Sequence, residues 1–156
     1  MESYTVLKDT REKDGWNFDA YQKCLGMEMA ALKTGDYTIK ELPGKVCIER
    51  KSGVEELAMN LGSDITRFEK ELERMMEFEH RYIIIECSMD SLMKYPIGSR
   101  APKTVKLSGK YLIRKLLQLQ IKYGFTFIFC ENKFNAFIVA ASILKRIFEE
   151  NETSDS

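Results

Sequence analysis

The stretch "GDYTIKELPGKVCIERKSG", residues 35–53, has the pattern of a β-hairpin whose second strand ends in three charges. Pro and Gly occupy favourable turn positions within residues 42–45. The apolar run VCI (46–48) is typical of a sheet interior, yet the charged run ERK (49–51) follows it without a turn signal. We therefore expect the charges to lie where the sheet face opens into a cleft.

The hairpin register predicts which of these side chains share a face. Symmetric closure around the turn would place Tyr37 opposite Arg50, because paired residues lie at equal distances from the turn. Since side chains alternate along a strand, residues of one face recur at every second position. One face would then hold Asp36, Glu49 and Lys51, and the other would hold Tyr37, Ile39, Val46 and Ile48. A one-residue bulge would separate the charged cluster.

Two carboxylates and a lysine on one face suit a hard divalent cation. Mg²⁺ binds one or two carboxylates, keeps several waters and accepts phosphate oxygens. Such a cation favours deprotonation of a water and neutralises charge on a phosphodiester, and Lys51 would orient the water or stabilise that charge. The alternative is a frayed strand end with a surface ion pair between Asp36 and Lys51. Spacing alone leaves both interpretations open.

The remaining periodicities predict a single α/β domain with a central mixed β-sheet flanked by helices, in the order β-α-β-β-α-β-α-β-α. Around the 36–50 hairpin we expect strands at 3–9, 81–88 and 125–130, helices at 18–33, 63–79, 110–123 and 132–150, and a long mobile loop at 91–109. The domain would span residues 1–150, and residues 151–156 would form a polar C-terminal tail.

The charge distribution is uneven although the net charge is zero. Residues 91–130 carry eight basic side chains and no carboxylate, which favours a local positive field for phosphate contacts. The DNA-binding candidates in this block are Arg100, Lys103, Lys106, Lys110 and Arg114, and Tyr95 is a candidate for stacking on an unpaired base. A solvated loop followed by a basic helix face explains the block equally well.

Cysteine and histidine usage argues against zinc and disulfide chemistry. The four cysteines are far apart and His80 is the single histidine, so we expect buried free thiols in a reducing cytoplasm. No apolar run approaches the ~20 residues that span a bilayer. The helix at 132–150 is apolar nearly all round, which indicates deep burial or a subunit contact. We favour a homodimer formed through this helix.

Five short motifs together resemble the XPF-type (Hef-like) endonuclease domain of the PD-(D/E)xK nuclease superfamily. They are "DTRE" (9–12), "GDY" (35–37), "ERKS" (49–52), "RFEKE" (67–71) and "YIIIE" (82–86). The resemblance implies Mg²⁺- or Mn²⁺-dependent cleavage of DNA near branches, flaps or single/double-strand junctions, and dimerisation through this domain. The chain is similar to compact stand-alone versions of phage or bacterial genomes, without helix-hairpin-helix motifs.

The resemblance also implies a role for individual residues. Asp36 and Glu49 would be the metal ligands, and Lys51 would assist the attacking water. Arg50 and Asp9 would also be catalytic positions: Arg50 would support the site or hold a phosphate, and Asp9 matches the first acidic residue. Supporting residues would be Arg67 on the following helix, with Glu55 and Glu56. Two departures stand out: the acidic residue after ERK is Glu55 or Glu56 where the family has Asp, and Glu71 stands where Gln is common.

Two other functions remain as alternatives. The first is a catalytically silent DNA-binding or scaffolding subunit of a nuclease complex, since the family includes partners without catalytic residues. The presence of Asp36, Glu49, Arg50 and Lys51 favours an active enzyme over that subunit. The second is a nuclease of the same superfamily with another target, such as RNA or nicked duplex.

Overall fold

The computed structural model describes residues 3–19, 21, 24–102 and 104–154. The strands are β1 (Tyr4–Asp9), β2 (Cys24–Ala30), β3 (Tyr37–Ile39), β4 (Val46–Lys51), β5 (His80–Ile85) and β6 (Thr126–Phe129). The helices are α1 (Val54–Leu61), α2 (Ile65–Met75), α3 (Met89–Met93), α4 (Gly109–Tyr123) and α5 (Lys133–Ser154). Within the described residues, no helix is long and apolar enough to cross a membrane.

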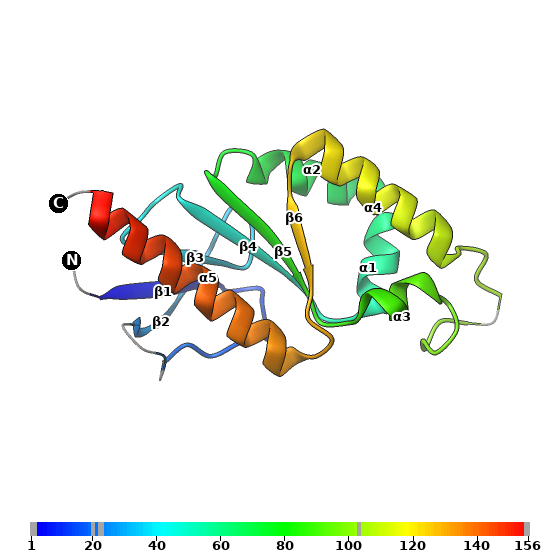
Figure 1. The fold of residues 1–156 in the computed structure, drawn as a ribbon, viewed down its shortest axis with the longest axis horizontal. Helices are drawn as coiled ribbons and strands as arrows, with labels where there is room; N and C mark the ends of the chain where they lie inside the picture. The colour runs from blue at the N-terminus through cyan, green and yellow to red at the C-terminus, as the bar shows by residue number, and fades with distance from the viewer. Residues whose placement is uncertain (1–2, 20, 22–23, 103, 155–156) are drawn as a thin grey trace.

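The six strands form one mixed sheet in the order β2-β1-β3-β4-β5-β6. β1 pairs in parallel with β2, β3 runs antiparallel to both β1 and β4, and β4, β5 and β6 are parallel to one another. Helices cover both faces: α5 crosses one face, and α1 to α4 lie beyond the other (Figure 1). The predicted class, a single α/β domain with a mixed sheet flanked by helices, is confirmed.

The alternation along β4 separates two hydrophobic cores. Val46 and Ile48 pack with β1, β3 and the buried side of α5. Cys47 points to the opposite core, with Leu57 of α1 and Leu72 of α2. Glu49 follows Cys47 by two residues and therefore faces the α1 and α2 side, whereas Arg50 faces the α5 side. The strand thus directs its two adjacent charges to opposite faces of the sheet.

The predicted helix at 18–33 is wrong, because residues 24–30 form strand β2. The segment is rich in Leu, Met, Ala and Glu, which favour helices in isolation. Parallel pairing with β1, from Cys24 opposite Tyr4 to Ala30 opposite Asp9, overrides that preference. β2 is an edge strand, and Leu25 and Met29 remain exposed. Residues 20, 22 and 23 of the predicted helix lie outside the described residues.

Helix α1 was not predicted from the sequence. Its buried residues, Val54, Leu57, Ala58 and Leu61, follow the spacing of one helical face. The predicted helix at 63–79 is shorter in the structure, where α2 ends at Met75. At the C-terminus, α5 continues to Ser154, beyond the expected helix end at residue 150.

Several described residues of the expected mobile loop at 91–109 are instead packed against the protein. The segment begins with the end of α3, and Leu107 and Val105 contact the core of α1, α2 and α4. Tyr95 is buried in that core at 8% exposure. The suggestion that Tyr95 stacks on a base is therefore wrong, because its ring already packs inside the protein.

The hairpin register differs from the symmetric prediction by two residues. Tyr37 pairs with Ile48 rather than with Arg50. Two successive backbone turns, Leu42 N–H to the Ile39 carbonyl and Lys45 N–H to the Leu42 carbonyl, lengthen the connection between the strands. A shift of two residues keeps every side chain on its predicted face, because the side-chain period is two. All four cysteines are free, as expected, and Cys47, Cys87 and Cys130 are buried.

Candidate active site

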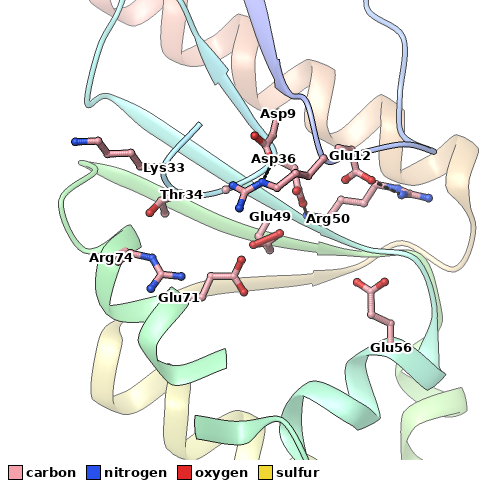
Figure 2. Close-up of a pocket in the computed structure, with 12 residues that line it drawn as sticks. Asp9, Glu12, Lys33, Thr34, Asp36, Glu49, Arg50, Glu56, Glu71 and Arg74 are labelled. Atoms are coloured by element: carbon pink, nitrogen blue, oxygen red, sulfur yellow. Dashed lines mark hydrogen bonds and ion pairs between the residues drawn. The ribbon is translucent and has the colours of Figure 1, made fainter. Parts of the chain in front are cut away.

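The ends of β1 and β4, the β2–β3 loop, and helices α1 and α2 surround a cleft of ≈ 300 Å³ (Figure 2). Six carboxylates line it: Asp9, Glu12, Asp36, Glu49, Glu56 and Glu71. The basic lining residues are Arg11, Lys33, Arg50 and Arg74. The cleft is therefore polar and dominated by acidic groups that converge from five separate segments of the chain.

Glu49 lies at the floor of this cleft and is 5% exposed. Its Oε2 atom is buried and forms no hydrogen bond with any residue that the structure describes. Burial, followed by the neighbouring Asp36 carboxylate, raises the pKa of Glu49 well above its ordinary value, although Lys51 opposes this shift. A buried carboxylate without a partner is costly, so this group is poised to accept a cation or a proton.

Asp36 is fixed beside Glu49 by backbone bonds to both neighbouring strands. Its N–H donates to the Ile48 carbonyl at 2.8 Å, and its carbonyl accepts from the Asp9 N–H at 2.9 Å. The Asp36 carboxylate accepts from the Arg50 N–H at 2.7 Å. The side chain is therefore held over β4, where its carboxylate meets that of Glu49. The predicted juxtaposition of Asp36 and Glu49 is present in the structure.

Asp9 also lines the cleft, but both of its carboxylate oxygens are already engaged. Oδ1 accepts from the Leu32 N–H at 3.0 Å, and Oδ2 accepts from Arg11 Nε at 2.8 Å. Asp9 is 3% exposed. These bonds hold the segment after β2 against the end of β1, and thereby shape the wall of the cleft.

The Arg50 side chain leaves the cleft and enters a buried network on the other face of the sheet. Its Nε and Nη2 atoms donate to Glu86 at 2.8 Å each, and Nη1 donates to Glu12 at 3.1 Å. The guanidinium also lies over the Trp16 ring, whose Nε1 donates to the same Glu86 carboxylate at 2.9 Å. With three of its five N–H donors engaged and 6% of its side chain exposed, Arg50 is anchored rather than free to hold a phosphate.

Glu12 connects this network to the cleft. Burial and then the Asp36 carboxylate raise the pKa of Glu12 to about 7, while Arg50 lowers it. The Glu12 side chain is 12% exposed. Glu12 therefore lines the acidic cleft and also accepts a hydrogen bond from the guanidinium of Arg50.

Lys51 is buried next to the cleft, between α1 and α2. Its Nζ lies 4.9 Å from the centre of the Phe68 ring and 3.9 Å from Glu56 Oε1. Glu56 lines the cleft, and its Oε2 accepts from the Ser52 hydroxyl at 2.9 Å. Glu55 points instead to the 95–107 segment, where it accepts from the Arg100 N–H at 2.9 Å. Of the two acidic candidates after ERK, the structure brings Glu56 to the cleft.

Arg67 is not brought to the cleft. Its side chain is 80% exposed and pairs with Asp64 at 3.3 Å. The same helix contributes Glu71 and Arg74 to the lining instead. The carboxylates of Glu71 and Glu49 point toward each other in Figure 2, and Glu71 is among the groups that raise the pKa of Glu49 after burial and Asp36.

The basic candidates of the 91–130 block that the structure describes lie outside this cleft. Arg100, Lys106, Lys110 and Arg114 are exposed, and Arg100 Nε lies 3.5 Å from Glu55 Oε1. Lys103 lies outside the described residues. The block therefore provides accessible cations on the segment before α4 and on its first turns.

The residues present fit a divalent cation at one point in particular. In the described part of the chain, no three His, Cys, Asp or Glu side chains form a ready-made metal cage. However, Glu49 Oε2 is a buried acceptor without a donor, and Asp36 lies beside it. Such a sparse carboxylate pair is what Mg²⁺ uses, because it retains several waters.

Residues of the site and its support that were not singled out from the sequence are Glu12, Lys33 and Arg74 in the lining, and Trp16 and Glu86 behind it. Glu86 left a signal, because a carboxylate directly after the apolar run of β5 has to find a buried partner. Trp16, the single tryptophan, left none, since it lies in an irregular segment.

Comparisons with known proteins identify the family and the fold of the chain. The ERCC4 domain family matches residues 8–140, so the chain belongs to that family of XPF-type nuclease domains. Among curated protein sequences none matches. The chain is similar in structure to XPF from Aeropyrum pernix, with a TM-score of 0.66 and 19% identity over 90% of this chain and 60% of that one.

A second similar structure is XPF from Aeropyrum pernix in complex with DNA. Its TM-score is 0.63 at 18% identity, over 95% of this chain and 66% of that one. The chain thus spans less than two thirds of the length of either structure. At these identities the likeness establishes the fold, which is the XPF nuclease-like fold.

Proposed function

We propose that this chain is a divalent-metal-dependent endonuclease that hydrolyses DNA phosphodiester bonds near branched, flap or single/double-strand junctions. The observation that carries the proposal is the buried, unpartnered Glu49 Oε2 beside Asp36, at the floor of a cleft in an ERCC4-family fold. Residues 1–150 would form the nuclease domain. The similar structure determined with DNA supports a nucleic-acid substrate.

Asp36 and Glu49 would hold Mg²⁺ or Mn²⁺. A bound cation supplies Lewis-acid chemistry here: it favours deprotonation of water and offsets the charge that develops on the phosphate. Lys51 orients the attacking water, and its pairing with Glu56 keeps the ammonium near the cleft. Asp9 shapes the cleft wall through Leu32 and Arg11, and Arg50 braces β4 from behind through Glu86.

A cleavage assay tests this function. Single-stranded, duplex, 3′-flap and forked DNA are incubated with Mg²⁺ or Mn²⁺, and the wild type is compared with Asp36→Asn and Glu49→Gln. We expect metal-dependent cleavage that both substitutions abolish while the circular dichroism spectrum is unchanged. Cleavage that survives both substitutions would place the active site elsewhere. Binding of forked DNA without cleavage, in either metal, would favour the catalytically silent subunit.

The basic block would supply contacts to DNA away from the cleft. Arg100, Lys106, Lys110 and Arg114 are exposed, so they would be accessible to phosphates, and Lys103 belongs to the same proposal. Alanine at Arg100, Lys103 and Lys106 should weaken binding and flatten its dependence on salt. Unchanged affinity for every DNA form would contradict this part of the proposal.

The second partner would be another copy of this chain, docked through α5. Phe134 and Ile138 are 70% and 44% exposed. They line an apolar groove of ≈ 510 Å³ together with Ile128 and Phe129 of β6, the edge strand of the sheet. Exposed apolar groups next to an open sheet edge favour a protein interface.

A further inference from the structure

The acidic cleft raises an electrostatic problem for a DNA substrate. Six carboxylates line it, and a DNA backbone carries one negative charge per phosphate. One divalent cation offsets only part of this repulsion. If the proposed function is correct, other cations in the cleft must meet the phosphates that flank the cut bond.

Two of the four basic residues in the lining are already committed to protein partners. The Arg50 guanidinium is bonded to Glu86 and Glu12. The Arg11 guanidinium is bonded to Asp9 and to the Leu32 carbonyl, at 2.8 Å in each case. Arg50 is 6% exposed and cannot meet a substrate without loss of these bonds, whereas Arg11 is 74% exposed but is held in place beside Asp9 and the Leu32 carbonyl.

Lys33 and Arg74 differ from that pair. Both are exposed, and neither forms an ion pair or a side-chain hydrogen bond with any of the residues at 3–19, 21, 24–102 and 104–154. Lys33 belongs to the β2–β3 loop and Arg74 to the last turn of α2, so they come from opposite walls of the cleft. Figure 2 shows both at the same end of the cleft, with Arg74 directed toward Glu71.

We propose that Lys33 and Arg74 form a phosphate clamp for the strand that is cut. The planar guanidinium of Arg74 would bind a phosphate through two donors, and the ammonium of Lys33 would act as a point charge on a neighbouring phosphate. The clamp places the strand across the opening above Glu49 and Glu71. The 91–130 block then contacts the more distant part of the DNA.

The salt dependence of binding tests the clamp. Anisotropy of a labelled forked DNA is measured over a series of salt concentrations, in EDTA and in Ca²⁺, for the wild type and for Lys33→Ala/Arg74→Ala. Loss of two phosphate contacts should reduce the slope of log affinity against log salt by about 1.4 to 1.8. At low salt we expect roughly tenfold weaker binding.

Lys40→Ala/Lys70→Ala is the matched control, because it removes the same net charge. Lys40 pairs with Glu28, Lys70 is an exposed residue of α2, and neither lines the cleft. We call Lys33→Ala/Arg74→Ala the cleft variant. The clamp is overturned if the control reduces the slope equally, or if the cleft variant keeps the wild-type slope. If the cleft variant alone changes the slope but the wild type cuts no DNA, the clamp holds and the proposed nuclease function fails. If the wild type cuts DNA and the cleft variant cuts and binds equally well, only the clamp fails.

Discussion

The side chains of Arg50 and Glu86 form a two-bonded ion pair between the ends of neighbouring strands, with both N···O distances at 2.8 Å. Arg50 lies in β4, and Glu86 directly follows β5. Their side chains are 6% and 4% exposed, so the pair is shielded from water. Trp16 Nε1 bonds to the same carboxylate and attaches the irregular segment after β1. This buried network supports the backbone that presents Glu49 to the cleft.

We expect Glu86→Ala to lower the free energy of unfolding by about 3–5 kcal/mol, because it leaves the buried guanidinium of Arg50 without its main partner. Urea denaturation measures the change. Glu79→Ala is the control, since Glu79 pairs with Lys45 on the surface and its side chain is 56% exposed; its loss should change the stability little. Equal costs for the two substitutions would contradict a buried bracing role for Glu86.

Glu49→Gln should change the stability in EDTA little, because burial and Asp36 raise the pKa of Glu49 and the metal-free side chain is then a neutral, protonated group of similar shape to Gln. Mg²⁺ should raise the melting temperature of the wild type, since a ligand of the native state stabilises it, and should leave that of the variant unchanged. Thermal unfolding with and without Mg²⁺ measures both effects. A wild type that is indifferent to Mg²⁺ and Mn²⁺ would contradict the metal site, independently of any cleavage assay.

The sequence allowed the acidic centre of the site to be predicted, because strand alternation is insensitive to a register shift of two. Asp36 and Glu49 therefore meet although Tyr37 pairs with Ile48. The sequence could not decide between Glu55 and Glu56. Adjacent helical residues point about 100° apart, so one faces the cleft and the other faces Arg100.

The errors come from tertiary contacts that local patterns do not contain. Residues 24–30 form an edge strand because β1 offers a parallel partner, against their helical composition. Arg67 and Arg74 lie on one helix, and only the packing of α2 beside β4 determines which of them reaches the cleft. The Glu86 network joins residues far apart in the chain, and no local signal pairs them.

Gly109→Ala should destabilise the protein by about 2–3 kcal/mol through overpacking. Gly109 begins α4, and a Cβ there would collide with the backbone carbonyl oxygens of Leu92 and Met93 at the end of α3. Those atoms belong to the main chain and move only if α3 shifts. Chemical denaturation measures the loss, with Lys110→Ala as a neighbouring exposed control that should change stability little. If Gly109→Ala leaves the stability unchanged, α3 shifts freely relative to α4.

Phe134→Ser/Ile138→Ser should convert a dimer into a monomer, because it places two hydroxyls in the apolar groove between α5 and β6. Sedimentation velocity over a range of protein concentrations measures the oligomeric state. Ile121→Ser is the control: Ile121 is 85% exposed on α4, outside the groove, and its replacement should leave the dimer intact. A wild type that stays monomeric at every concentration would contradict the α5 interface. A dimer that survives the double substitution would place the contact on another surface.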